Sequence, residues 1–395
     1  MTALERIKSL SAGYSSKVVE HRRHLHANPE LSYQEFNTVK YVKEELAKIG
    51  IPTQALATTG LIAEIKGNRP DKQTIALRAD MDALPIQEAN EVAYKSTSAG
   101  VMHACGNDVH TASLLGTAYI LNEIRSDFEG TVRLLFQPGE EKNPGGASYM
   151  IRDGALENPR PSAIIGQHVF PMLPVGKIGF REGMYMASAD EIYLRVIGKG
   201  GHGAAPELAI DPIVIASHII IALQQIISRN ASPRQPTVLT FGNIIGKGAT
   251  NIIPDYVDVA GTFRAMDEKW RADGLSKIRK MAESIATGMG GRCEVEISMG
   301  YPYLENDPSL TRRIRKAAEQ YVGPENVVDL DITLGAEDFA YYSHVVPASF
   351  YRLGTRNEAR GITSYVHTPT FDIDEDALSI SSGLMAWMAL CELQN

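Results

Sequence analysis

The first clear helical signal in the chain lies between residues 36 and 49. Apolar residues recur there at the spacing of one helix face, at Phe36, Val39, Val42, Leu46 and Ile49. Ser32 followed by Glu35 has the pattern of a capping box, in which two side chains satisfy the free amides at a helix start. Because Gly50 ends the run, we expect a helix that begins at Ser32 and stops before this glycine.

Short apolar runs alternate with helical segments through the first half of the chain. The pattern predicts strands over 74–77, 132–136 and 163–166, and helices over 111–124 and 147–151. Strands that alternate with helices are typical of an α/β domain with a largely parallel sheet. We therefore expect this fold class for the first half of the chain.

The pattern changes near residue 187. The predicted elements are then a strand over 191–197, a helix over 211–227, strands over 237–241 and 256–263, a helix over 268–287 and a strand over 293–298. This β-α-β-β-α-β order indicates a split βαβ sandwich, which can fold as an inserted domain. The α/β pattern returns after residue 300 and ends in a helix over 374–392. We therefore expect a discontinuous α/β domain over 1–186 and 299–395, with a smaller domain inserted over 187–298.

Composition and charge exclude several classes of protein. The 39 basic and 47 acidic side chains give a formal net charge of −8 without a basic block, so we expect no nucleic-acid partner. The first residues are charged and lack the apolar segment of a signal peptide. The most apolar run, 213–227, contains His218 and two glutamines, so we expect no membrane partner. Three cysteines are too few for a disulfide framework, which indicates a cytoplasmic protein.

Metal-binding residue types lie where predicted strands end, the usual place for sites in open α/β sheets. They occupy four segments: 102–110, 137–141, 166–171 and 366–372. A thiolate, imidazoles and carboxylates together suit a divalent transition metal better than calcium or magnesium. Of the adjacent Glu140 and Glu141, one can bind the ion while the other moves protons. Each side chain also has a structural interpretation, such as a hydrogen-bonded histidine or a buried cysteine, and sequence spacing alone leaves both open.

Eight motifs occur in one consistent order: HLHANPE, LRADMDALP, HACGND, QPGEE, GGHGAAP, NIIP, GAEDF and VHTPTFD. With them the chain resembles the M20 metallopeptidase superfamily, in particular its amidohydrolase branch of hippurate, N-acyl-amino-acid and IAA-amino acid hydrolases. The likeness runs from about residue 16 to residue 390. It implies a phosphorylase/hydrolase-like catalytic domain and a ferredoxin-like α+β domain that serves as lid and dimerisation domain.

The resemblance implies a site with two divalent metal ions, of manganese, zinc, cobalt or nickel. Its ligands would be Cys105, Glu141, His168 and His367, and Glu140 would be the general base for the attacking water. Asp82 would orient the site, although a turn with capped backbone amides is an alternative interpretation. The histidines near the start of the chain, His21, His24 and His26, lie on a helical stretch and are interpreted as surface and packing residues rather than ligands.

In the resembling family the histidine that matches His202 reaches across a homodimer interface and polarises the scissile carbonyl. Asn251 and Arg264 match positions that hold the substrate, and a guanidinium suits bidentate recognition of a carboxylate. An ion pair at the surface is the alternative for Arg264. The implied partners are therefore a second copy of the chain and a small N-acyl amino acid.

The chain departs from the family pattern at Asn107, where members have a histidine that binds metal. A neutral amide oxygen is a poorer ligand for zinc-like ions than an imidazole nitrogen. The substitution indicates altered metal use, a natural loss of catalysis, or an engineered inactive form. The sequence thus predicts metal-dependent hydrolysis of N-acyl amino acids, impaired to an extent set by Asn107. The alternatives are a dipeptidase or N-acetyl-diaminopimelate deacetylase, and a disabled protein that binds N-acyl amino acids.

Overall fold

The computed structural model describes residues 1–395, which form two compact units. The first consists of Met1–Tyr185, Glu305–Ile332 and Asp338–Asn395. The second consists of Met186–Leu304 and Thr333–Glu337. The second unit is therefore an insertion in the sequence of the first, and each is described by itself below.

The first unit contains an eight-stranded sheet. In spatial order its strands are β1 (Thr53–Leu56), β2 (Gly60–Lys66), β4 (Thr131–Gln137), β3 (Thr74–Asp80), β5 (Ala163–Pro174), β16 (Ala348–Arg356), β6 (Ile178–Phe180) and β15 (Val327–Asp329). The central strands β4, β3, β5 and β16 are parallel. The predicted, largely parallel α/β sheet is therefore confirmed. The carboxyl ends of these four strands lie along one edge of the sheet, where sites of α/β proteins form.

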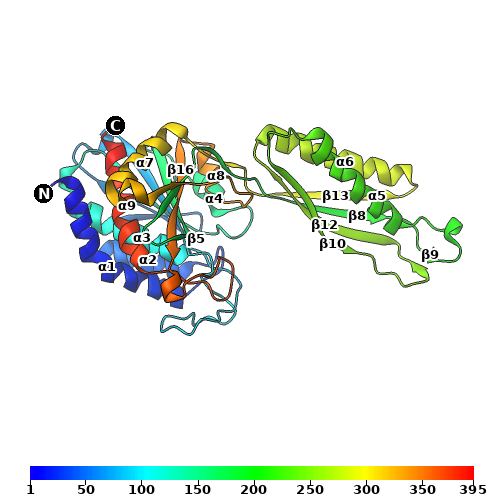
Figure 1. The fold of residues 1–395 in the computed structure, drawn as a ribbon, viewed down its shortest axis with the longest axis horizontal. Coiled ribbons are helices and arrows are strands. Elements are labelled where there is room, and N and C mark those ends of the chain that lie inside the picture. Colours follow the sequence, from blue (N-terminus) through cyan, green and yellow to red (C-terminus); the bar gives the residue numbers. More distant parts are fainter. The chain divides into compact units, whose positions relative to one another are not determined.

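Helices cover the sheet of the first unit. They are α1 (Ala3–Ala27), α2 (Phe36–Lys48), α3 (Asn107–Glu123), α4 (Gly146–Arg152), α7 (Pro308–Val322), α8 (Ala340–Ser343) and α9 (Asp376–Leu393). Helices α1, α3 and α9 pack against one another (Figure 1). Most residues of α3 and α9 are buried, and the buried residues lie on all sides of each helix rather than on one face.

The second unit contains a four-stranded antiparallel sheet with two helices. Along the chain its elements are β8 (Asp190–Ile197), α5 (Pro212–Gln225), β10 (Thr237–Ile245), β12 (Tyr256–Ala265), α6 (Glu268–Gly288) and β13 (Arg292–Met299). The spatial order of the strands is β10-β12-β8-β13, and α5 and α6 pack together on the sheet (Figure 1). Side chains of β8 alternate between buried and exposed, because one face of the sheet meets the helices and the other does not.

Smaller elements complete the two units. A short ladder pairs β9 (Gly201–His202) with β11 (Ile252–Ile253) in the second unit. Strands β7 (Gly183–Met186) and β14 (Leu304–Asn306) lie where the chain passes from one unit to the other. The apolar segment Pro212–Asn230 is long enough to span a membrane by length and composition, but 33% of its window is buried in the unit. The expected absence of a membrane partner stays a prediction.

The predicted capping box at Ser32 is wrong. Helix α2 begins at Phe36, and neither Ser32 nor Glu35 caps its start. The carboxylate of Glu30 does so instead, accepting from the amides of Asn37 and Thr38. The Ser32 hydroxyl instead donates to Asp82 Oδ2 at 2.7 Å, and Glu35 accepts hydrogen bonds from the amides of Tyr33 and Gly139. Tertiary partners therefore bind both side chains that the local pattern assigned to the helix.

Candidate metal centre

Four side chains from four separate segments of the first unit converge at the carboxyl edge of its sheet. Cys105 precedes α3, Glu141 follows β4, His168 lies in β5, and His367 lies in the loop before α9. Cys105 Sγ lies 3.4 Å from His168 Nε2 and 3.3 Å from His367 Nε2. Glu141 Oε2 is 3.7 Å from His367 Nε2. The ligand atoms of Cys105, Glu141 and His367 all lie within 4.8 Å of one another, close enough to bind a single ion.

The protonation state of His168 suits a metal ligand. Its Nδ1 lies 2.7 Å from the main-chain oxygen of Val169 and donates to it, so the Nε2 lone pair faces Cys105. Burial, together with the positive charge of Arg352, lowers the pKa of His168 well below its usual value. The ring is therefore neutral at physiological pH, which is the form that binds metals.

Burial and the nearby carboxylates of Glu141 and Glu140 raise the pKa of the Cys105 thiol well above its usual range. A cation bound among these groups would instead lower the pKa of the thiol, because its positive charge stabilises the thiolate and offsets the negative charge of the carboxylates. A thiolate, two imidazoles and a carboxylate are a suitable donor set for a divalent transition metal. The residues of this centre therefore fit the group that the family resemblance implies.

His110, in the same motif as Cys105, is not available to bind metal. The amide of Val169 donates to its Nε2 at 2.9 Å, so the ring proton is on Nδ1 and is donated to Asp80 Oδ1 at 2.6 Å. Asp80 also accepts from Arg78, which donates to Asp338 as well. These buried groups lie beneath the centre and support the strand ends that carry it. The short sequence motifs gave no sign of this chain of contacts.

Asp82 holds the two adjacent glutamates by their backbone. Its Oδ1 accepts from the amide of Glu140 and its Oδ2 from the amide of Glu141, both at 2.9 Å. Burial raises the pKa of Asp82 to about 7, even though the Ser32 hydroxyl favours the ionised form. Asp82 therefore caps the backbone amides of Glu140 and Glu141, far away in the sequence, rather than the amides of its own turn, and it fixes the main chain that carries both glutamates.

Asn107 has one of its two polar atoms occupied. Its Nδ2 donates to the main-chain oxygen of Asp82 at 2.8 Å. Its Oδ1 is buried and has no hydrogen-bond partner. The only atom that Asn107 can offer to an ion is therefore an amide oxygen.

The remaining predicted site residues lie in the second unit. His202 in β9 and Asn251 beside β11 are neighbours, since the amide of Gly203 donates to the main-chain oxygen of Asn251 at 2.9 Å. Both side chains are exposed. Arg264, in β12, is half-buried.

Sequence reasoning missed a buried ionic cluster close to the centre. His26 was interpreted as a surface or packing residue, but it is fully buried and lies between the carboxylates of Asp108 and Glu88. Arg22, one helical turn earlier, is also fully buried. The four-residue spacing of Arg22 and His26 on one helix face is the signal that could have found them.

Comparison with known proteins agrees with this geometry. The pattern of peptidase family M20/M25/M40 matches residues 76–390. The chain is 40% identical over 383 residues to an N-acetylcysteine deacetylase of Bacillus subtilis, covering 96% of this chain and 98% of that protein. A putative aminohydrolase of methicillin-resistant Staphylococcus aureus has a similar structure, with TM-score 0.91, 35% identity and coverage of 98% of each chain. The Bacillus subtilis YXEP protein, described as a dinuclear metal-binding peptidase of family M20, has TM-score 0.82 and 36% identity, and covers 97% of this chain and 99% of its own. The chain therefore belongs to peptidase family M20/M25/M40 and is a metal-dependent amidohydrolase.

Proposed function

We propose that this amidohydrolase cleaves the amide bond of small N-acyl amino acids, and that Cys105, Glu141, His168 and His367 hold its divalent metal. The observation that supports this most strongly is the convergence of these four side chains beside Glu140. When bound there, a divalent cation polarises the scissile carbonyl and lowers the pKa of a water molecule. Manganese, zinc, cobalt and nickel are all compatible with this mixed set of ligands.

Glu140 is the general base of the proposed reaction. Its carboxylate takes a proton from water as the water oxygen bonds to the carbonyl carbon, and gives that proton to the leaving nitrogen as the C–N bond breaks. The products are a carboxylate and a free amine. Glu140 is 7% exposed, and its backbone amide is held by Asp82, so the general base is kept in a fixed, largely dry position. A fixed base is efficient because it needs no rearrangement as the proton moves.

We further propose that the second unit is the lid and dimerisation domain. His202 of the partner subunit would donate to the carbonyl oxygen, and Asn251 and Arg264 would hold the substrate carboxylate. In support, the amide of Ala204 donates to His202 Nδ1, so the ring proton is on the exposed Nε2 and is free to be donated. Arg264 is half-buried, and this burial lowers the pKa of its guanidinium.

Exposed apolar residues on the second unit support a homodimer. Strand β10 is an edge strand whose outer backbone groups have no neighbouring strand. Apolar side chains are exposed at the end of this strand and along α5: Ile213, Val214, Ile221, Ile244 and Ile245. Exposed apolar patches of this kind mark protein–protein contacts. A soluble, cytoplasmic dimer is the assembly that we propose.

Asn107 favours a second candidate function, a protein that binds N-acyl amino acids without hydrolysing them. Its amide oxygen replaces an imidazole at a position where the family binds metal, and a weakened metal position lowers catalysis more than binding.

A substrate panel tests the proposal and separates the candidates. Hippurate, N-acetyl amino acids, N-acetyl-diaminopimelate and dipeptides are each incubated with the chain and added manganese, zinc or cobalt. Release of free amine from the N-acyl amino acids supports the proposed function. Preference for dipeptides or for N-acetyl-diaminopimelate assigns the chain to those activities instead. Calorimetric binding of N-acyl amino acids without turnover identifies the disabled binding protein.

A further inference from the structure

Arg22 is a fully buried cation that joins two segments, each of which follows a proposed metal ligand in the sequence. From α1, its Nε donates to Asp108 Oδ2 at 2.9 Å, and its Nη2 donates to Asp372 Oδ1 at 2.7 Å. Its guanidinium also lies over the ring of Tyr94, 4.6 Å from the centroid. One planar side chain thus fixes the position of two carboxylates that are far apart in sequence.

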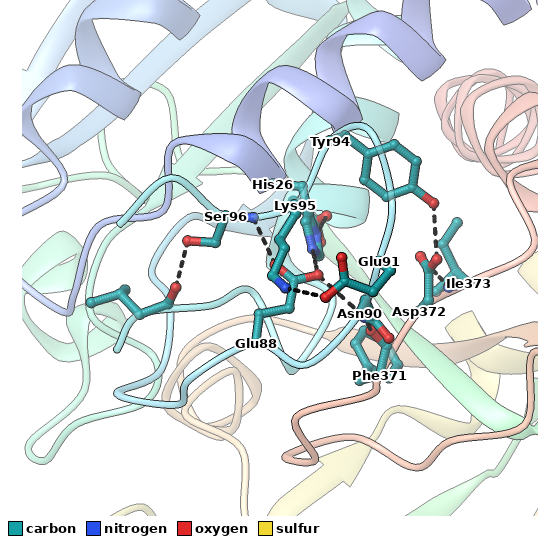
Figure 2. Close-up of polar contacts among 12 residues, drawn as sticks. His26, Glu88, Asn90, Glu91, Tyr94, Lys95, Ser96, Phe371, Asp372 and Ile373 are labelled. Carbon is teal, nitrogen blue, oxygen red and sulfur yellow. Dashed lines mark hydrogen bonds and ion pairs between the residues drawn. The ribbon is translucent and has the colours of Figure 1, made fainter. Parts of the chain in front are cut away.

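His26 extends this cluster by one helical turn. Its Nδ1 lies 2.7 Å from Asp108 Oδ2 and its Nε2 lies 3.1 Å from Glu88 Oε1. Glu88 belongs to the 86–101 loop and also accepts from the amide of Ser96 in the same loop, so its bond to His26 joins a locally ordered loop to the cluster (Figure 2). We call Arg22, His26, Glu88, Asp108 and Asp372 the ionic hub.

A second set of bonds joins the 86–101 loop to the segment that follows His367. Asn90 Nδ2 donates to the main-chain oxygen of Phe371 at 2.9 Å, and the Tyr94 hydroxyl donates to Asp372 Oδ2 at 2.8 Å (Figure 2). Arg22 and Tyr94 therefore both connect the hub to the segment that follows His367.

The two carboxylates that Arg22 holds lie close in sequence to metal ligands. Asp108 is in the first turn of α3, three residues after Cys105, and Asp372 is five residues after His367. The two ligand loops also touch directly, since the amide of His367 donates to the main-chain oxygen of Ala104 at 2.7 Å. The separation of Cys105 Sγ and His367 Nε2 therefore depends on how the hub holds the two loops.

His367 has a backbone conformation that needs support from its surroundings. Its φ is +62°, in the left-handed region that side chains other than glycine avoid. Such a conformation persists only where neighbouring contacts over-determine it. The amide of His367 itself bonds to Ala104, and Asp372, five residues later, bonds to Arg22 of the hub.

Stability is a weak explanation for so many buried charges. Desolvation opposes the burial of each ion, and apolar side chains of similar volume often stabilise a core equally well. A buried ionic cluster instead defines one geometry, because its bonds are directional. The hub is therefore better explained by the relative position of the two loops that it holds.

From these contacts we infer that Arg22 and His26 are positioning residues for the metal centre. They hold the Cys105 loop against the His367 loop, so that thiolate and imidazole bind the same ion. This inference rests on the proposed metal centre. It adds a role for two residues that touch neither metal nor substrate.

The test uses the full chain, freed of metal and titrated with cobalt(II). Absorption from thiolate-to-cobalt charge transfer reports the Cys105 bond, and the titration gives the dissociation constant. The variants are Arg22→Met and, because loss of a buried cation can prevent folding, Asp372→Asn, which keeps the size of the side chain. Arg133→Met is the matched control, because Arg133 is an equally buried arginine that bonds to Glu64 and to main-chain oxygens away from the centre. Circular dichroism and thermal unfolding of the metal-free proteins compare their folding.

We expect Arg22→Met and Asp372→Asn to weaken cobalt binding by about 10–100-fold, the usual effect of removing a group that orients a ligand, and to reduce the charge-transfer band. We expect Arg133→Met to lower thermal stability and leave the cobalt spectrum unchanged. The inference is overturned if Asp372→Asn folds and binds cobalt with the wild-type affinity and spectrum, or if Arg133→Met alters them equally. Failure of the unchanged chain to show the thiolate band instead overturns the metal centre, and the inference with it.

Discussion

The side-chain amide of Asn107 donates a hydrogen bond to the main-chain oxygen of Asp82, with 2.8 Å between the two atoms. This bond leaves only the amide oxygen of Asn107 to face an ion. Since such an oxygen binds zinc-like metals poorly, we expect the chain to retain one ion per subunit after dialysis.

The change Asn107→His tests this expectation. We predict that the histidine variant retains a second ion and hydrolyses N-acyl amino acids faster than the chain as it stands. Elemental analysis of both proteins measures the first effect, and amine release measures the second. Two tightly held ions in the unchanged chain would show that Asn107 does not weaken metal binding.

Glu140 and Glu141 are adjacent but have different proposed tasks, so they form a matched pair. Glu140→Gln removes the general base, and we expect kcat to fall by about 10²–10⁴-fold with the metal content unchanged. Glu141→Gln removes a ligand, and we expect weaker metal binding that excess metal partly offsets. Metal titration followed by turnover assays on both variants measures the difference. Equal metal loss in the two variants would contradict this division of roles.

His21 is predicted to make the fold sensitive to acid. Its Nδ1 accepts from the Tyr41 hydroxyl, and its Nε2 donates to the Tyr119 hydroxyl, which in turn donates to Glu45. Both ring nitrogens are therefore satisfied in the neutral form. Burial lowers the pKa of His21 to about 4, against 6.5 for an ordinary histidine.

Between about pH 4 and pH 6.5, His21 of the unfolded chain binds a proton that His21 of the folded protein does not. The free energy of unfolding therefore falls as the pH drops from about 6.5 to about 4, by on the order of 3 kcal/mol from this residue. Urea unfolding at pH 7 and pH 4.5 measures the fall. His21→Gln is expected to reduce it, whereas His344→Gln, at an exposed histidine of the first unit, serves as the control. An unchanged pH dependence in His21→Gln would show that other groups cause the acid sensitivity.

The proposed dimer surface can be tested at Ile221, which is 72% exposed on α5. A charge in the centre of an apolar interface is costly to bury, so Ile221→Asp is predicted to convert the dimer to a monomer. Phe36→Asp introduces the same charge at an exposed apolar residue of the first unit and is predicted to leave the assembly unchanged. Light scattering during size-exclusion chromatography gives the mass of each species. A monomeric parent chain, or a dimer that survives Ile221→Asp, would remove support for this surface.

Local patterns predicted the central strands β3, β4 and β5 and the main elements of the second unit, because apolar spacing reports which face of an element is buried. They did not predict α7, β2 or β16. They also indicated the four segments with metal-binding residue types, and the family resemblance selected Cys105, Glu141, His168 and His367, which lie together in the structure. The segments were identifiable because each lies near the end of an apolar run that predicts a strand, or just before a predicted helix.

Local patterns were less informative wherever a tertiary partner decided the outcome. Ser32 followed by Glu35 has a good capping pattern, yet Ser32 bonds to Asp82, fifty positions away. The ionic hub joins Arg22 to Asp372 across 350 positions, and no local pattern reports a contact of that length. Charged residues on a helix are ordinarily exposed, so nothing in the local pattern around Arg22 and His26 indicated a buried ionic cluster.

The insertion of the second unit sets an order for assembly on the ribosome. Helix α1 packs against α9, and β5 pairs with β16, so the first unit lacks a helix of its core and a central strand until the last residues are synthesised. All four strands of the second unit's sheet, β8, β10, β12 and β13, are made before β16 and α9 emerge. During synthesis the inserted unit can fold while the larger unit still exposes unpaired strand edges and apolar helices, the surfaces that chaperones recognise.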